Sequence, residues 1–539
     1  MTASKTLRIV GMLLMIVSGL RQVHAGSGPT RSADRGDGTY GNPVLFADYS
    51  DPDVIRVGDV YYMVSSSFNF VPGIPVLRSK DLVNWTIVGH VVPRLPSPMF
   101  DTPQYGNGIW APSIRYHAKQ FWVYYGDPDL GIFMSTAKHA EGPWQPLVLV
   151  RAGKGWIDPC PFWDDDGKAY LVHAWANSRS GIKSVLTVNR MDQSGTSLLD
   201  DDRTVFDGRA HQPTIEGPKF YKRNEFYYIF APAGGVKPGW QTVLRSRNVF
   251  GPYEDRIVLH QGSTSINGPH QGAWVETSSG ESWFLHFQDR GPYGRVLHLQ
   301  PLVWKDDWPV IGNLNDRDGI GEPILIGPKP QCDKPTPVMV PQTTDEFETT
   351  ALGLQWQWPA NAQDRWSSLS ARKGSLRLYA MPPNQAEGNL WEVPNLLLQK
   401  IPYQEFTATT RLQASGLPVG GTAGLLVLGL DYSYVGVVHA TDGVRITRVT
   451  CKDADRQTRE TEEAHVNIPG EELYLRVAMD TSATCSFSYS LDGERFESIG
   501  TRFTAREGKW IGAKVGLFCL GHSSREMNGY VDFDWFRME

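Results

Sequence analysis

Three acidic residues occupy closely similar settings in the first half of the chain. Asp51 and Asp158 each directly precede a proline, and Glu216 directly precedes a Gly-Pro pair. Carboxyl groups that lie close together repel one another, so one keeps a raised pKa and can act as an acid while another acts as a base. Hydrolysis of a glycosidic bond requires such a pair.

A repeated unit could bring these three side chains together. A polar turn followed by an aromatic strand recurs five times, and its copies are marked by Tyr61, Trp122, Tyr170, Tyr227 and Trp283. Five units of this length with alternating strands fit propeller blades of four strands each, whereas an all-β sandwich would not explain five ordered copies. We therefore predict a five-bladed β-propeller over residues 41–326. Equivalent positions of its blades converge on one face, so the three carboxyl groups should meet in one pocket.

The pattern changes after the fifth unit. Residues 327–344 are rich in proline and predict a stiff linker. From residue 345 to residue 539 the chain alternates apolar and polar residues in short segments such as 376–379, 424–430 and 473–478. Strands without helices over this length predict a β-sandwich of the jelly-roll type.

The N-terminus has the features of an export signal. Lys5 and Arg8 precede an apolar run, residues 9–20, that is too short to span a bilayer, and small residues precede Gly26. We predict a signal peptide over residues 1–25 and a disordered lead over residues 26–40. The mature protein should be secreted or periplasmic, without membrane attachment after cleavage.

Composition excludes some partners and leaves others open. A net charge of −6 gives no basic face for nucleic acid. The 18 Trp fit a sugar-binding protein, although β-rich proteins also use aromatic residues in strands. Five Cys are too few for a disulfide scaffold and their spacings match no zinc site. Cys451 and Cys485 are the pair to test for a bond that export would permit.

The motifs around the acidic residues resemble those of glycoside hydrolase family 43. The resemblance covers about residues 41–312, and the region after residue 340 resembles the concanavalin-like sandwich of the family's β-xylosidase and arabinofuranosidase branches. The motifs that carry it are Asn42-Pro43 with Asp51-Pro52-Asp53, residues 79–85 (SKDLVNW), residues 108–112 (GIWAP), Asp158-Pro159 with residues 164–167 (DDDG), and residues 215–218 (IEGP).

The resemblance implies roles for the three carboxyl groups. Asp51 would be the general base that activates water, Glu216 the general acid, and Asp158 the residue that tunes the acid and holds the sugar. The family inverts the anomeric centre, so base and acid should lie about 6.5–9.5 Å apart with water between them. Asp48 and Asp53 lie near Asp51 and could be mistaken for the base, but only Asp51 stands in the family's position before a proline.

The resemblance also implies a sugar pocket. Phe68 and Trp110 would be its aromatic walls, and Arg295 would bond the sugar near the acid. His270 would approach a channel water or a structural calcium ion held through water. The alternatives are a blade-core role for Trp110, an ordinary salt bridge for Arg295 and a structural role for His270. Hydrolysis itself requires no cofactor.

These observations predict an inverting exo-glycoside hydrolase that releases terminal α-L-arabinofuranose, β-D-xylose or both from plant hemicellulose or its oligosaccharides. Residues 65–73 and 156–161 favour the arabinose-active branches. The alternative is a non-catalytic carbohydrate-binding propeller, which would keep Trp110 and Arg295 but lose a carboxylate. The sandwich is either a carbohydrate-binding module or a buttress whose loop closes one side of the active site, and residues 432–434 are the candidate loop.

Overall fold

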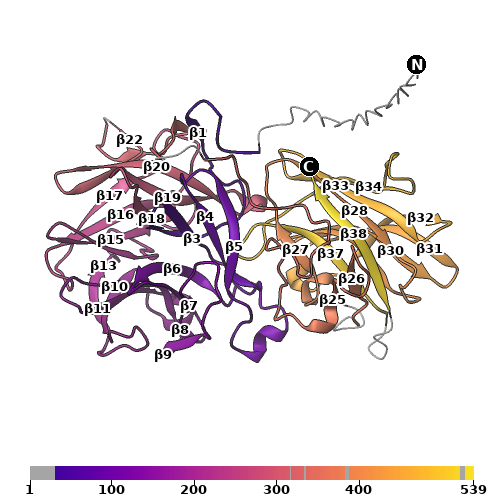
Figure 1. The fold of residues 1–539 in the computed structure, drawn as a ribbon, viewed down its shortest axis with the longest axis horizontal. Helices are drawn as coiled ribbons and strands as arrows, with labels where there is room; N and C mark the ends of the chain where they lie inside the picture. Colours follow the sequence, from indigo (N-terminus) through magenta and orange to yellow (C-terminus); the bar gives the residue numbers. More distant parts are fainter. Residues whose placement is uncertain (1–30, 316, 333–335, 383–387, 523–528) are drawn as a thin grey trace, which may run out of the picture. The chain divides into compact units, whose positions relative to one another are not determined.

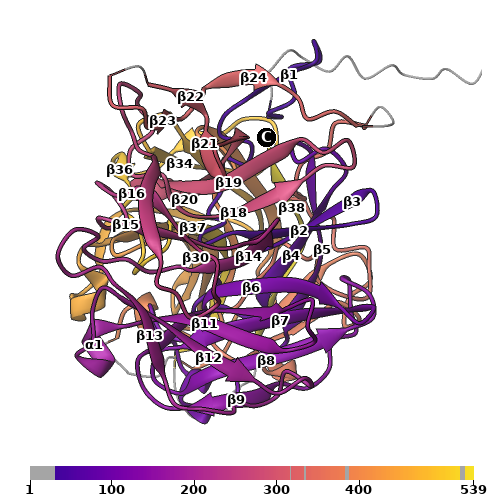
Figure 2. The same cartoon turned by 90° about the vertical axis from the view of Figure 1, so that its left-hand side faces the viewer.

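The computed structural model describes residues 31–315, 317–332, 336–382, 388–522 and 529–539. The predicted signal peptide and the first five residues of the predicted lead lie outside the described residues, so export stays a prediction. Within the described ranges, no helix is long and apolar enough to cross a membrane. The described chain is almost entirely strands and loops (Figure 1), with one short α-helix, α1 (Asn177–Ser180), labelled in Figure 2.

The first half of the chain forms five blades, each built on four consecutive antiparallel strands that pair as a meander, and two short strands extend the sheet of the fourth blade. Blade one contains β2 (Asp53–Val57), β3 (Val60–Val64), β4 (Gly73–Ser79) and β5 (Trp85–Val92). Blade two contains β6 (Trp110–His117), β7 (Gln120–Asp127), β8 (Gly131–Ala137) and β9 (Val148–Ala152). Blade three contains β10 (Trp156–Trp163), β11 (Ala169–Trp175), β12 (Val185–Met191) and β13 (Arg203–Asp207).

Blade four contains β14 (Lys219–Arg223), β15 (Phe226–Ala233), β16 (Trp240–Ser246) and β17 (Glu254–Leu259), and is extended by β23 (Gly321–Glu322) and β22 (Asn313–Leu314). Blade five contains β18 (His270–Glu276), β19 (Ser282–Asp289), β20 (Arg295–Lys305) and β21 (Trp308–Ile311). The first strands of neighbouring blades contact one another, for example β2 with β6, β6 with β10, and β18 with β2. The first strands therefore surround the axis of a five-bladed propeller, and blade five closes onto blade one.

The repeat recognised in the sequence marks one strand of each blade. Its five aromatic residues all lie on the second strand, and four of them, Tyr61, Trp122, Tyr170 and Trp283, are buried. Tyr61 packs in one apolar cluster with Trp283, so these aromatic residues join the first and last blades. Burial of such large side chains between sheets is the main apolar contribution that holds adjacent blades together.

The end of the predicted disordered lead is part of a strand in the structure. β1 (Thr39–Gly41) pairs antiparallel with β24 (Ile326–Pro328), as Figure 2 shows. Tyr40 is fully buried, and its hydroxyl donates a hydrogen bond to the Leu299 carbonyl oxygen. This aromatic anchor and the strand pairing order a segment whose composition is otherwise typical of disorder.

The proline-rich segment lies along the propeller. The Lys329 ammonium contacts the carboxylates of Asp34 and Asp81 at 2.5 and 3.0 Å. Farther along, the Met339 backbone N–H donates to the Asn84 side chain. The segment therefore reaches the second half of the chain while held against blade one.

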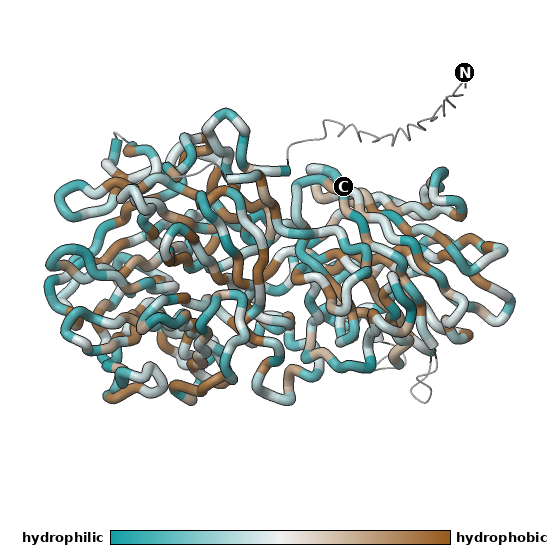
Figure 3. The backbone as a smooth tube through the Cα atoms, viewed as in Figure 1, coloured by the Kyte–Doolittle hydropathy of each residue, from teal (hydrophilic) through white to brown (hydrophobic). Residues whose placement is uncertain are grey.

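The second half of the chain is a sandwich of two antiparallel sheets. The first sheet has the order β25 (Ser367–Ser368), β26 (Leu376–Tyr379), β38 (Tyr530–Met538), β28 (Phe406–Gln413), β33 (Glu472–Met479), β34 (Thr484–Ser490) and β35 (Glu497–Ser498), with β36 (Phe503–Thr504) beside β34. The second has the order β27 (Leu397–Lys400), β37 (Lys514–Leu520), β29 (Thr422–Leu428), β30 (Tyr432–Ala440), β31 (Gly443–Cys451) and β32 (Thr461–Ile468). Figure 3 shows apolar residues along the strands of both halves and hydrophilic residues at many turns.

The two halves share one apolar core. A single cluster of buried residues includes Val71 and Phe100 from the propeller and Trp356 and Trp358 from the sandwich. The backbones also pair directly, because Val71 and Trp358 exchange two hydrogen bonds. This continuity fixes the sandwich against blade one.

The disulfide considered for the sandwich does not form. Cys451 ends β31 in one sheet and Cys485 lies on β34 in the other, and both are buried free thiols. Burial raises the pKa of the Cys485 thiol to about 12, which keeps it protonated and unreactive. The two residues therefore contribute as small apolar side chains.

Candidate active site

The three carboxyl groups named in the sequence meet in one pocket at the axis of the propeller. The pocket encloses about 500 Å³ of empty space, its open mouth included. Its lining contains Asp51, Phe68, Trp110, Ala111, Ile157, Asp158, Glu216, Val236, Gln271, Arg295 and Trp510. A pocket that combines apolar walls with a few convergent polar groups is typical of a small-molecule site.

A recurring backbone feature aims side chains into this pocket. Near the start of the first strand in each blade, one residue has a positive φ: Asp51 (55°), Ala111 (31°), Asp158 (56°), Gly217 (59°) and Gln271 (41°). In blades two, three and five this residue lies at a register shift in the pairing of the first two strands. Such irregularities turn a side chain away from the direction that the sheet would give it, and strained backbone of this kind concentrates at functional sites.

Asp51 is held as a fixed carboxylate. The Ser66 hydroxyl donates a hydrogen bond of 2.6 Å to Asp51 Oδ2, and Arg295 Nη1 lies 3.2 Å from Oδ1. The Ser66 oxygen in turn accepts the Ala111 backbone N–H at 2.8 Å. With its side chain buried, Asp51 is ion-paired and cannot rotate freely, which suits a base that must hold a water molecule in one place.

Asp158 is buried beside the other two acids. Its Oδ2 accepts the Gly217 backbone N–H at 2.7 Å, which ties it to the residue that follows Glu216. Burial raises the pKa of the Asp158 carboxyl, and the negative charge of Asp51 raises it further. A side chain at position 217 would be strained, because φ there is 59°, and its Cβ would lie 2.7 Å from the Gln271 side chain, which would have to move.

Glu216 has the environment of a proton donor. Burial raises the pKa of its carboxyl above the usual range, and the charges of Asp158 and Asp51 add to the effect in that order. The side chain keeps 27% of its surface accessible, so a substrate entering the pocket can reach it. A protonated carboxyl near neutral pH can deliver its proton to a leaving oxygen.

His270 lies behind Glu216 rather than in the pocket lining. Its Nε2 is 3.5 Å from Glu216 Oε1, its side chain is fully buried, and neither ring nitrogen has a hydrogen-bond partner among the described residues. Burial lowers the pKa of the imidazole to about 3, with a further contribution from the charge of Arg295. The ring is therefore neutral near neutral pH.

The donors around His270 do not form a protein-built calcium site. No cluster of three or more His, Cys, Asp or Glu side chains that could hold a metal is present among the described residues. Calcium prefers six to eight oxygen ligands, whereas an imidazole and one carboxylate supply far fewer. Each unpaired nitrogen of His270 can form a hydrogen bond to a water molecule. A calcium ion held through such a water stays a prediction.

The two aromatic residues expected at the pocket both lie in its lining. Phe68 and Trp110 both line the pocket, with their ring centres 6.4 Å apart in an edge-to-face arrangement. Trp110 is only partly buried, so it serves the pocket as well as the packing between blades. The Arg295 guanidinium stacks over the Phe287 ring, 4.9 Å from its centre, and reaches Asp51. It is thus an ion-pair partner inside the pocket.

The neighbouring acids have other partners. Asp53 is fully buried and binds Arg115 Nη1 at 2.7 Å, which joins blades one and two. Asp48 accepts two backbone N–H groups. Asp164 pairs with Lys222, which ties the 164–166 turn to blade four. None of these carboxylates lines the pocket.

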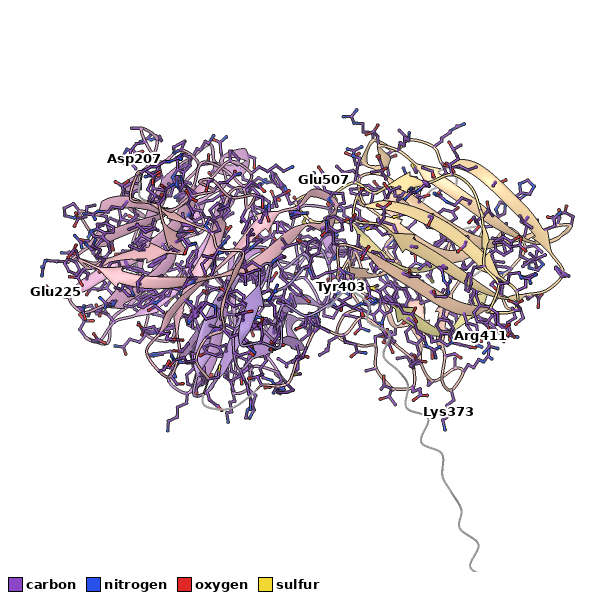
Figure 4. The ribbon with its side chains drawn as sticks, turned by 90° about the horizontal axis from the view of Figure 1, so that it is seen from above. Asp207, Glu225, Lys373, Tyr403, Arg411 and Glu507 are labelled. Carbon is purple, nitrogen blue, oxygen red and sulfur yellow. The ribbon has the colours of Figure 1, made fainter. Side chains whose placement is uncertain are left out.

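The sandwich supplies one wall of the pocket, in agreement with the buttress alternative, but from a loop that the sequence analysis did not name. Trp510 lies in the loop between β36 and β37, keeps 53% of its surface exposed, and lines the pocket opposite the propeller residues. Figure 4 labels Glu507, three residues before it. The predicted loop at residues 432–434 is wrong, because these residues are buried on β30. The signal for this loop in the sequence was a tryptophan two residues after Gly508, and its place at the pocket depends on how the two halves dock.

Comparisons with known proteins agree with this geometry. The model of glycosyl hydrolases family 43 matches residues 40–309, and the model of the beta xylosidase C-terminal concanavalin A-like domain matches residues 344–539. A Xylanibacter ruminicola protein is 44% identical over 90% of this chain and 87% of its own length. A beta-xylosidase of Formosa agariphila is 34% identical over 93% of this chain and 90% of its own.

A more distant relative and a solved structure extend the comparison. A non-reducing end alpha-L-arabinofuranosidase of Bacteroides ovatus is 29% identical over 92% of this chain and 94% of its own length. The crystal structure of the GH43 protein BlXynB from Bacillus licheniformis superposes with a TM-score of 0.79, at 27% identity, over 93% of this chain and 99% of that one.

A five-bladed propeller with three acids at its axis, followed by a concanavalin-like sandwich, defines a class of carbohydrate-cleaving enzymes. The chain belongs to glycosyl hydrolases family 43, with the C-terminal domain of its beta-xylosidases. It is a glycoside hydrolase.

Proposed function

We propose that this enzyme removes single pentose units from the non-reducing ends of hemicellulose chains or their oligosaccharides, with inversion at the anomeric carbon. The observation that carries the proposal is the pairing of two unlike carboxyl groups in one pocket. Asp51 is ion-paired with Arg295, whereas burial and two neighbouring charges hold the pKa of Glu216 high. Two carboxyl groups in different environments can serve as base and acid in one displacement.

The reaction would proceed in a single step. The Glu216 carboxyl gives its proton to the glycosidic oxygen as the bond from that oxygen to the anomeric carbon breaks. A water molecule attacks the same carbon from the opposite face and passes a proton to the Asp51 carboxylate. The products are a pentose of inverted configuration and a shortened chain that carries a new hydroxyl. Proton exchange with solvent then restores both carboxyl groups.

Asp158 and Arg295 would prepare this step. The charge of Asp158 raises the pKa of Glu216, and its hydrogen bond from Gly217 fixes the backbone next to the acid. Arg295 holds Asp51 in place and presents further N–H groups toward the sugar. Phe68, Trp110 and Trp510 offer flat apolar surfaces to the carbon–hydrogen faces of the ring.

We place β-D-xylose first among the pentoses and α-L-arabinofuranose second. The Formosa agariphila relative, named a beta-xylosidase, is more similar to this chain than the Bacteroides ovatus arabinofuranosidase. The two sugars have similar size and hydroxyl positions, so a pocket for one discriminates against the other only through a few polar contacts.

Parallel assays would test the proposal. The 4-nitrophenyl glycosides of β-D-xylopyranose and α-L-arabinofuranose are offered to the parent, Asp51→Ala and Glu216→Ala, and the first-formed anomer of the product is followed by proton NMR. We expect turnover by the parent, loss of turnover in both variants, and α-xylose as the initial product. An inactive parent that still binds pentosides would favour the non-catalytic alternative, and retained configuration would exclude the single step.

A further inference from the structure

Asp48 is a buried carboxylate for which the proposed reaction has no use. It lies three residues before Asp51, and its side chain is 4% exposed. Burial of a charge is costly unless hydrogen bonds or opposite charges compensate it, so its partners indicate what it does.

The partners of Asp48 come from both halves of the molecule. Its Oδ1 accepts the backbone N–H of Arg295 in the propeller at 2.9 Å, and its Oδ2 accepts the backbone N–H of Gly512 in the sandwich at 3.1 Å. Lys400, on strand β27 of the sandwich, donates to the Asp48 carbonyl oxygen at 2.5 Å. Lys514 lies opposite Lys400 on β37; burial lowers the pKa of both amino groups, and the charge of Asp48 opposes that effect.

The two backbone N–H groups that Asp48 binds, those of Arg295 and Gly512, both belong to segments that line the pocket. The Arg295 side chain extends from the first position to Asp51, and Trp510, two residues before Gly512, lines the opposite wall. The contact between the halves is tight here, because a Cβ on Gly512 would lie 2.6 Å from the Gly294 nitrogen. Ala513 N–H also donates to the Pro292 carbonyl oxygen at 2.7 Å. The sandwich loop therefore rests directly on the backbone that precedes Arg295.

We infer that Asp48 is a positioning residue that fixes where Arg295 and Trp510 lie relative to each other across the pocket. It touches neither the substrate space nor the reacting atoms, and it acts through one backbone N–H on each side. The inference rests on the proposed function, because it assigns to Asp48 the alignment of two walls of that pocket.

Asp48→Asn is the primary variant, since it keeps the shape of the side chain. The amide replaces one acceptor oxygen by a donor, so one of the two backbone N–H groups loses its partner. We expect kcat/KM on the 4-nitrophenyl xyloside to fall by about tenfold to a hundredfold, the range that misplacement of catalytic groups produces. Gly512→Ala keeps the Asp48 charge but pushes the loop away from Gly294, and should raise KM as well.

A double-mutant cycle separates alignment from simple stabilisation. If Asp48 acts through the Trp510 loop, the double variant Asp48→Asn with Trp510→Ala should lose much less activity than the product of the two single losses; independent sites agree with that product to within about twofold. Asp532→Asn is the matched control, because Asp532 is equally buried and is paired with Arg377 in the sandwich, away from the pocket. It should lower Tm without changing kcat or KM.

The outcomes distinguish the two proposals. An active parent with unchanged kcat and KM in Asp48→Asn, or single losses that multiply fully, would overturn the role of Asp48 and leave the proposed function intact. A parent that cleaves neither glycoside would overturn the proposed function itself. A change in kinetics for Asp48→Asn and Gly512→Ala, with none for Asp532→Asn, would support the alignment.

Discussion

At the scale of single residues, the role of Glu216 as proton donor should make the effect of its loss depend on whether the leaving group needs a proton to depart. Glu216→Gln removes the proton but keeps the shape, so kcat should fall by about a hundredfold to ten-thousandfold on a natural xylo-oligosaccharide. A leaving group that departs without protonation needs no acid, so the loss should be much smaller on the 2,4-dinitrophenyl xyloside. Equal losses on both substrates would mean that Glu216 is not the acid.

The charge of Asp158 should be visible in the pH profile. Glu216 must be protonated to act, so the basic limb of the kcat/KM profile reports its raised pKa. Asp158→Asn removes one of the negative charges that raise this pKa, and should move the basic limb to lower pH. Profiles of kcat/KM between pH 4 and 9 would measure the shift, and an unchanged limb would contradict the assignment.

The same substitution should make the protein more stable at neutral pH. The folded pKa of Asp158 is raised, so the unfolded state ionises first as pH rises, and the folded state loses stability from the ordinary carboxyl pKa up to the folded one. Asp158→Asn removes this cost while its oxygen can still accept the Gly217 N–H. Tm should therefore rise at pH 8 and change little at pH 3, as calorimetry would show.

At the scale of elements, the irregular starts of the first strands explain what the sequence could and could not show. The aromatic repeat marks the regular second strands, so the five blades could be predicted from residues such as Tyr61 and Trp122. Asp51, Asp158 and Glu216 were found because prolines and glycines accompany them. Ala111 and Gln271 were missed, because a register shift in a strand depends on its partner and leaves no fixed residue type in the sequence.

The loop between β36 and β37 forms the wall that the sequence analysis had assigned to residues 432–434. Trp510→Ala should raise KM by about tenfold, because a lost aromatic wall costs a sugar roughly 1–1.5 kcal/mol of contact. Tm should stay constant, because the side chain is more than half exposed. Lys509→Ala, in the adjacent exposed position, is the control and should leave KM unchanged. Equal KM values for the parent and Trp510→Ala would show that this wall does not touch the sugar.

At the scale of the whole molecule, the shared apolar core makes the propeller and the sandwich one folding unit. Val71 and Trp358 belong to the same buried cluster and exchange backbone hydrogen bonds. We expect a single calorimetric transition, and we expect a chain truncated at residue 328 to aggregate because the blade-one face of that core becomes exposed. Two separate transitions, or a soluble folded propeller, would contradict this expectation.

The order of the parts along the chain has a consequence for biosynthesis. A ribosome releases all five blades, with every acid of the pocket, before it has made the loop that carries Trp510. The acids of the pocket therefore precede one of its walls in the chain, and that wall arrives with roughly the last thirty residues of the sandwich. Docking of the C-terminal half thus completes the pocket, and substrate should bind more tightly once the Trp510 wall is in place.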